Sequence, residues 1–269
     1  MIAKLFTILC HTSPYLKRLI WRQWYQFLAG YYQRKDWSFM NYGYAPLDHR
    51  TEKLYLDDAD EPNRYCIQLY HHVAGVIDLK DLKVLEVSSG RGGGSYYIKR
   101  YLKPKTMVGV DFSEKAVAFC NKNYFVEGLS FVTGNAELLP FEDNSFDVVI
   151  NVESSHCYGS METFLNQVKR VLRQGGYFLY ADFRSKHKIY ILHKQLRRSG
   201  MTLIKETNIT PNVTEALNLD NERRMLFIQK LIPRLLLKSF QEFASVKGSK
   251  NYERFRNGRF IYLSYMMQK

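Results

Sequence analysis

Cysteine is scarce in this chain, and the few cysteines that it has are far apart. There are four among 269 residues, and no two of them have C-x-x-C spacing: Cys10, Cys66, Cys120 and Cys157. Disulfide-rich secreted domains and cysteine-based zinc sites need more cysteines or closer spacing. The sequence therefore excludes a disulfide framework, predicts no metal site, and favours a reducing, cytoplasmic compartment.

Long hydrophobic runs are also missing. The apolar run at the N-terminus covers only residues 1–10, about half of the roughly 20 residues that a membrane-spanning helix needs. No small-residue cleavage site follows this run, so we do not expect secretion. Internal repeats and low-complexity tracts are absent as well. The length and the ordinary hydrophobic content predict one large globular domain.

Acidic residues are outnumbered, mainly in the last third of the chain. The formal net charge is +13, and residues 184–269 carry 18 Lys and Arg against 6 Asp and Glu. A basic face can meet an anionic membrane, nucleic acid or acidic partners. Because no nucleic-acid-binding motif is visible, we expect peripheral membrane contact ahead of RNA. A solvated surface without a partner stays open, and the sequence does not indicate an oligomeric state.

The most informative stretch is residues 84–94. An apolar run containing Glu86 opens into a turn with Ser88 and glycines at 90, 92, 93 and 94. A second apolar run ends in Asp111, nineteen positions after Gly92. In a doubly wound α/β sheet, such a turn lets the backbone approach a nucleoside closely, and the second carboxylate accepts both ribose hydroxyls. The pattern predicts a nucleoside-cofactor site at this edge.

Strand-like and helix-like segments alternate along the central part of the chain, which predicts a parallel sheet flanked by helices. The expected strands are residues 83–87, 106–110, 129–133, 145–151 and 176–182, with closing strands at 201–206 and 259–266. A helix opens at Asp60 with Pro62 near its start and runs to Val73. Residues 213–248 are expected to be helical, with a break at Pro233.

The glycine turn reads E-x-S-x-G-x-G, which resembles the first motif of class I S-adenosylmethionine-dependent methyltransferases. Ser88 stands where that family has glycine, and it would cost about 1 kcal/mol if the position needs a positive φ. We expect the backbone to tolerate the small side chain. Residues 134–141 resemble the family's third motif, with Asn135 in place of Asp, so that an amide carbonyl replaces a carboxylate as acceptor.

The resemblance extends over nearly the whole chain. It is strongest with the ubiquinone- and tocopherol-type small-molecule methyltransferases, and within them with the phthiotriolone dimycocerosate methyltransferases, through residues 37–43, 65–70, 151–158 and 177–184. It implies a Rossmann-like seven-stranded sheet with an antiparallel last strand, and S-adenosylmethionine as cofactor. It also implies three groups of contacts. Glu86, Ser88, Gly90 and Gly92 shape the methionine end. The ribose and adenine are met by Asp111, Phe112, Asn135 and Ala136, and Asn151 presents its backbone near the sulfonium.

The chemistry is expected beyond the carboxyl ends of the fourth and fifth strands. An alcohol acceptor must lose a proton as the new bond forms, and a base within hydrogen-bond reach accepts it. We predict His156 as this base, because neutral imidazole is abundant near pH 7, with Asp182 as its partner. Glu153 is a second candidate for the catalytic role.

The N-terminal part is expected to cover the pocket. We divide the chain into a helical capping segment at residues 1–75 and a methyltransferase domain at 76–269 with a helical insertion at about 210–250. Residues 18–28 have helical spacing of apolar and basic residues, which suits a lid, membrane contact or plain packing. Residues 36–44 are expected to form pocket wall.

The leading function is therefore O-methylation of a hydrophobic small molecule, such as a lipid or polyketide. Three alternatives stay open. They are C-methylation of a quinol-like ring, a cofactor-binding protein without turnover at a membrane, and methylation of RNA. The acceptor does not follow from the fold.

Overall fold

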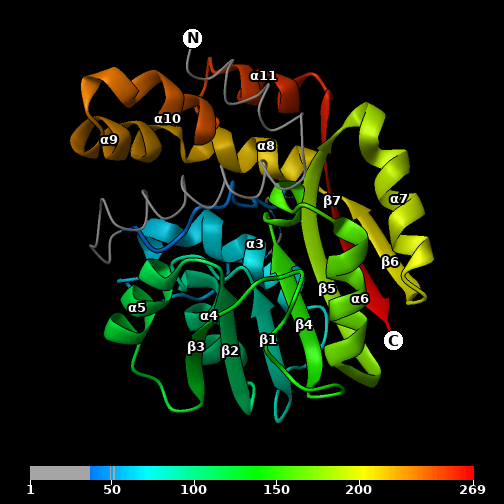
Figure 1. Cartoon of the computed structure of the whole chain (residues 1–269). Helices are drawn as coiled ribbons and strands as arrows, with labels where there is room; N and C mark the ends of the chain where they lie inside the picture. Colours follow the sequence, from blue (N-terminus) through cyan, green and yellow to red (C-terminus); the bar gives the residue numbers. More distant parts are fainter. Residues whose placement is uncertain (1–36, 49, 51) are drawn as a thin grey trace.

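The computed structural model describes residues 37–48, 50 and 52–269. The predicted N-terminal helix at 18–28 and the whole segment before it therefore lie outside the described residues. In the described part the chain forms one seven-stranded sheet with helices on both sides (Figure 1). Its strands are β1 (Lys83–Val87), β2 (Thr106–Asp111), β3 (Leu129–Thr133), β4 (Phe146–Val152), β5 (Leu172–Ser185), β6 (Thr202–Asn208) and β7 (Phe260–Gln268).

The strand order is β3-β2-β1-β4-β5-β7-β6. Strands β1 to β5 pair in parallel, whereas β7 runs antiparallel to both of its neighbours. The prediction of a doubly wound, mostly parallel sheet with an antiparallel last strand is confirmed. From β1 the chain builds the sheet outward in one direction through β2 and β3, and β4 and β5 then lie on the other side of β1. The carboxyl end of β1 is therefore the topological switch point, where ligands bind in such sheets.

The sheet separates the two main hydrophobic clusters, and helices cover each face of the sheet. The described α-helices are α3 (Arg64–Ala74), α4 (Gly93–Tyr97), α5 (Glu114–Asn123), α6 (Met161–Val171), α7 (Ile189–Arg198), α8 (Thr210–Leu219), α9 (Asn221–Leu231), α10 (Leu237–Phe243) and α11 (Lys250–Arg256). Buried residues of α3, α8 and α11 pack with Val84 and Leu179 on one face of the sheet. Buried residues of α6 and α7 pack with Leu85 and Phe178 on the other. Adjacent strand residues thus face opposite layers.

Local sequence explains where several helices begin. The Ser113 hydroxyl accepts a hydrogen bond from the Ala116 amide at 3.2 Å, and the Ser160 hydroxyl accepts one from Thr163 at 3.1 Å. Both serines cap the free amides of a helix N-terminus. Pro62 lies in the short 3-10 turn Glu61–Asn63 that leads into α3. The three helices that begin at these points are α5 after β2, α6 after β4 and α3 after the 3-10 turn. Their N-termini set where the loops after β2 and β4 end.

Strand β5 is longer than predicted. It pairs with β4 at Phe146–Leu172 and again at Val148–Tyr177, so three more residues lie between the pairs on β5 than on β4. The extra residues include Gly175, whose φ is +79°. The predicted strand began at residue 176, whereas the turn through Gly175 forms inside the observed strand as a bulge. The segment from 210 to 250 contains α8, α9 and α10, and α9 ends two residues before Pro233.

Candidate active site

A cavity of about 160 Å³ lies at the carboxyl ends of the central strands. Its wall includes Ser88 and Gly90 after β1, Asp111 at the end of β2, Asn135 after β3 and Glu153 after β4. The fold thus brings together predicted residues that are as far apart as 65 positions in the chain. Phe112 and Ala136, also predicted, line the same cavity.

The glycine turn has the left-handed backbone that its composition predicts. Gly90 and Gly92 have φ values of +54° and +77°. Ser88 also has a positive φ, +61°, so the serine stands in the conformation that costs about 1 kcal/mol. Its hydroxyl lies 2.7 Å from the Tyr158 hydroxyl. That hydrogen bond offsets part of the strain and explains how serine is accommodated here.

Asp111 ties the turn to the second strand. Its Oδ2 accepts a hydrogen bond from the Gly90 amide at 2.8 Å, and its Oδ1 accepts one from the Ser113 amide at 2.8 Å. Burial raises the pKa of Asp111, while these amide donors oppose the rise. A carboxylate oxygen can accept a further bond, and Asp111 lines the cavity, so both oxygens retain capacity for a pair of hydroxyls.

Ser89 is a wall residue that sequence reasoning missed. The residue lines the cavity, its side chain is buried, and its hydroxyl has no protein partner. A buried hydroxyl left without a partner is costly, so this atom fits a site that a polar ligand completes. The only signal in the sequence was its place in the glycine turn.

Three predicted cofactor residues lie behind the wall. Glu86 is buried and accepts hydrogen bonds from the Tyr70 hydroxyl at 2.6 Å and the Ser95 hydroxyl at 2.5 Å. Gly92 is the N-cap residue of α4, and a Cβ there would come within 2.8 Å of Tyr124. Asn151 Nδ2 donates to the Val87 carbonyl at 2.9 Å. None of these three is among the lining residues, so their contacts shape the turn and the strand end.

The first described residues form the opposite wall. Trp37, Ser38, Phe39, Met40 and Asn41 all line the cavity, as expected for the segment at 36–44. The Gly93 amide donates to the Ser38 carbonyl at 3.3 Å, which joins this segment to the glycine turn. Asn135 Oδ1 accepts from the Glu137 amide at 3.0 Å, so part of its acceptor capacity holds its own loop.

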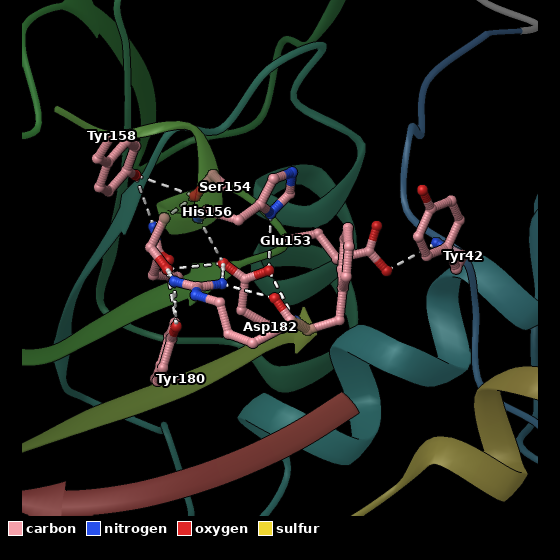
Figure 2. A network of polar contacts seen from close by, with 11 residues as sticks. Tyr42, Glu153, Ser154, His156, Tyr158, Tyr180 and Asp182 are labelled. Atoms are coloured by element: carbon pink, nitrogen blue, oxygen red, sulfur yellow. Dashed lines mark hydrogen bonds and ion pairs between the residues drawn. The ribbon is translucent and has the colours of Figure 1, made fainter. Parts of the chain in front are cut away.

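A buried polar network surrounds Asp182 (Figure 2). Asp182 Oδ1 accepts from His156 Nδ1 at 2.8 Å, and Oδ2 accepts from the Ser155 hydroxyl at 2.6 Å. An Arg184 nitrogen lies 3.0 Å from Oδ2. Burial opposes ionisation of Asp182, but Arg184 and His156 hold its pKa below the usual range. The predicted pairing of His156 with Asp182 is present in the structure.

The charge state of His156 differs from the expectation. Burial lowers its pKa, but Cys157 and Asp182 outweigh burial and raise the pKa to about 10. The ring is therefore mainly charged near pH 7, whereas we predicted the neutral form. A carboxylate partner favours imidazolium, and Asp182 was itself predicted. Neither His156 nor Asp182 is among the residues that line the cavity.

Glu153 does line the cavity. Burial is the main cause that raises its pKa to about 7. Its Oε1 accepts a hydrogen bond from the Tyr42 amide at 2.8 Å, and Figure 2 shows the side chain turned toward Tyr42. Its φ is +50°. Among the described residues no group of three His, Cys, Asp or Glu side chains could hold a metal ion.

We expect Asp182→Asn to destabilise the protein by about 3–5 kcal/mol, because it leaves buried Arg184 and His156 charges without their counter-ion. Urea unfolding measures this loss. Asp143→Asn is the matched control. Asp143 also pairs with an arginine, but its side chain is 68% exposed, so its loss should cost about 1 kcal/mol or less. Equal effects of the two substitutions would contradict the assignment of Asp182 as the centre of a buried network.

Comparison with known proteins identifies the family. Residues 85–180 match the methyltransferase domain model. The chain is 36% identical over 261 residues to the phthiotriol/phenolphthiotriol dimycocerosates methyltransferase of Mycobacterium tuberculosis, an alignment that covers 96% of this chain and 94% of the relative. This chain belongs to the class I S-adenosylmethionine-dependent methyltransferases. A second relative, the fatty-acid O-methyltransferase of Mycolicibacterium smegmatis, is 36% identical over 87% of this chain and 84% of its own length.

Solved structures place the methyltransferase among proteins of varied activity. It superposes on the [4+2]-cyclase SpnF with a TM-score of 0.71 at 16% identity, covering 92% of this chain and 94% of the cyclase. It superposes on the cyclopropane synthase MmaA2 of Mycobacterium tuberculosis with a TM-score of 0.68 at 13% identity, covering 85% and 90%. These likenesses show the fold alone. In the described part of the methyltransferase, no helix is long and apolar enough to cross a membrane.

Proposed function

We propose that this methyltransferase transfers the methyl group of S-adenosylmethionine to a hydroxyl of a hydrophobic small molecule, such as a lipid or polyketide. The observation that carries the proposal is the shared cavity, which has Asp111 at one strand end and Glu153 at another. The surface of the wall is mostly apolar, and five aromatic side chains contribute to it: Trp37, Phe39, Tyr70, Phe112 and Tyr158. The names of the two relatives, which denote lipid-like substrates, support a hydrophobic acceptor.

The described residues fit the proposed cofactor. Asp111 would accept the ribose hydroxyls, Phe112 and Ala136 would contact the adenine, and the turn at 88–90 would hold the methionine end. The unpartnered hydroxyl of Ser89 supplies one more hydrogen-bonding group to this site. When bound, the cofactor supplies a methyl group on a sulfonium that is already activated, so the protein chiefly orients the acceptor and excludes water.

Glu153 is the base that the geometry favours, ahead of the predicted His156. A base must be unprotonated near the working pH and must reach the acceptor. With a pKa of about 7, Glu153 is about half ionised at neutral pH, and it lines the cavity. His156 lacks both properties, and we assign it, with Asp182, to holding the loop after β4. The base at Glu153 accepts the hydroxyl proton as the oxygen–carbon bond forms.

C-methylation of a quinol-like ring also needs a base, so only the product separates it from O-methylation. A protein that binds cofactor without turnover would show affinity but no methylated product from any acceptor. Incubation with labelled S-adenosylmethionine and, in parallel, long-chain secondary alcohols and quinols, followed by product analysis, tests all three possibilities. A carboxylic acid acceptor needs no base, so its methylation should be insensitive to loss of the Glu153 carboxylate.

The capping role of residues 1–75 and the expected membrane contact remain proposals. The described part supports each in one respect. Residues 37–41 form a cavity wall. For membrane contact, two apolar residues are exposed on the surface: Tyr190 in α7 is 68% exposed and Ile204 in the edge strand β6 is 50% exposed. A hydrogen bond between His193 and Glu206 joins α7 to β6. The chain around them is basic, which suits an anionic membrane surface.

A further inference from the structure

A second, smaller cavity of about 70 Å³ lies under the helices that follow β6. Its wall is mainly apolar and comes from α9, α10 and the turns beside them, including Phe227, Ile228, Ile232, Phe240 and Phe243. In Figure 1, α9 and α10 lie beside α8 in the layer of helices above α3. The apolar residues of this layer make their own cluster, distinct from the two cores that cover the sheet.

The two cavities share one wall. Trp37, Phe39, Met40 and Asn41 line both the cavity at the strand ends and the cavity under α9 and α10. The shared stretch is therefore a partition only a few residues long. A molecule that reaches from one cavity to the other would pass these side chains, and a methyl acceptor with a long apolar tail has that shape.

The partition is anchored at both ends. Arg91 Nε donates to the Trp37 carbonyl. At the other end, Arg224 donates to the carbonyls of Asn41 and Tyr42 at 3.2 and 3.1 Å. Met40 lies between these anchors, and its Cε would be 2.9 Å from a Cβ at Gly90. Methionine is unbranched and adapts its shape readily, so the side chain between the anchors can move without loss of a backbone hydrogen bond.

The arginines of the smaller cavity do not make it a site for an anion. Arg223 forms two hydrogen bonds of 2.6 Å with Asp220, and Arg224 forms one of 2.9 Å with the same carboxylate. Arg224 also donates to the Ala244 carbonyl at 3.3 Å. With their heads committed to Asp220 and to backbone carbonyls, these arginines offer the cavity their aliphatic stems. The interior therefore suits hydrocarbon.

We propose that the cavity under α9 and α10 binds the hydrocarbon chain of the acceptor, with the chain passing Met40 so that the reacting hydroxyl lies beside Glu153. This inference rests on the proposed function for the choice of acceptor. It assigns to the helical insertion a role in selecting acceptors by chain length.

The test uses Ala244→Phe in the full chain. Ala244 lines the smaller cavity but not the larger one, and it is half-buried, so a phenyl ring there fills space without deleting a side-chain bond. The probe is cis-parinaric acid, an 18-carbon chain whose fluorescence rises in apolar surroundings, titrated in the presence of saturating S-adenosylhomocysteine. We expect its affinity to fall roughly tenfold or more, which corresponds to displacing about two methylene groups.

Two controls separate a filled cavity from a damaged fold. Leu226→Phe likewise adds a phenyl ring, here on α9. Because Leu226 is 68% exposed and does not line the cavity, probe affinity should stay unchanged. Phe243→Ala enlarges the cavity and should alter the preferred chain length. S-adenosylhomocysteine affinity should be the same in all variants. A wild-type protein that does not bind the probe, or an Ala244→Phe protein that binds it normally, would overturn the inference.

The outcome is independent of methyl transfer. Probe binding that Ala244→Phe removes, together with no methylated product from any acceptor, would refute the proposed function and leave the hydrocarbon site standing. If wild type and Ala244→Phe both methylate short and long alcohols at equal rates, that result would support the proposed function and refute the hydrocarbon site.

Discussion

Glu153→Gln should lower kcat/KM for a hydroxyl acceptor by about 100-fold, because the amide cannot accept the proton that leaves the hydroxyl. Glutamine has nearly the same shape, and its carbonyl oxygen can keep the bond that the Tyr42 amide donates to Oε1. S-adenosylhomocysteine affinity should therefore stay near the wild-type value. Steady-state kinetics with a long-chain secondary alcohol and calorimetric titration measure the two quantities.

The pH dependence of kcat/KM distinguishes a base from a residue with a purely structural role. Since the base must be ionised, wild-type kcat/KM should rise with pH through about 7, the pKa of Glu153. Glu153→Gln should remove this rise. If His156 were the base, the rise would instead lie near 10, the pKa that Asp182 and Cys157 help to set. His156→Gln serves as the matched comparison, and a 100-fold loss there with an unaffected Glu153→Gln enzyme would return the role to His156.

Asp111→Ala should weaken S-adenosylhomocysteine binding by more than about tenfold, since hydrogen bonds to a charged acceptor contribute about 1.5–3 kcal/mol each. Asp111 stands at the end of β2 and lines the cavity, with each oxygen already oriented by an amide, Gly90 or Ser113. The carboxylate is thus held in place before the ligand arrives. Calorimetric titration gives the affinity directly.

Asp111→Ala also deprives two amides of their acceptor, so loss of affinity could come from a disordered turn. Asp111→Asn is the control, because its carbonyl can still accept from one amide. We expect Asp111→Asn to bind more weakly than wild type and more tightly than Asp111→Ala, while urea unfolding shows little change. Wild-type affinity in both variants would remove Asp111 from the cofactor site.

Much of the fold follows from the sequence because each element is locally consistent. Five apolar runs alternate with helix-like segments, and all five appear as parallel strands within a few residues of the predicted bounds. The strand bounds were least accurate at β5. There the Gly175 turn forms a bulge within the strand, since β5 pairs with β4 on both sides of it. A single sequence does not show that pairing.

The cofactor end of the site was also accessible from spacing. Ser88, Gly90, Asp111 and Asn135 follow strand ends, and strand ends of a parallel sheet meet at one rim. The hydrogen-bond partners of the other predicted cofactor residues depend on tertiary contacts. Glu86 is satisfied by Tyr70, a residue of α3 that no local pattern connects with the glycine turn.

The catalytic end depended still more on long-range contacts. The charge on His156 depends on Asp182, 26 residues further along. Burial raises the pKa of Glu153 toward neutrality. The sequence pointed to all three residues, but we chose His156 as the base from the ordinary pKa of histidine, which the folded surroundings change.

Isotope labelling shows directly whether the methyl group is transferred to oxygen. Incubating the full chain with S-adenosylmethionine carrying a ¹³C-labelled methyl group and a long-chain secondary alcohol, then locating the label by NMR, shows where the methyl group goes. We expect a methyl ether, with the labelled methyl group on oxygen, and loss of that product in Glu153→Gln. Label on a carbon atom, or no labelled product from any long-chain alcohol while the cofactor binds, would contradict it.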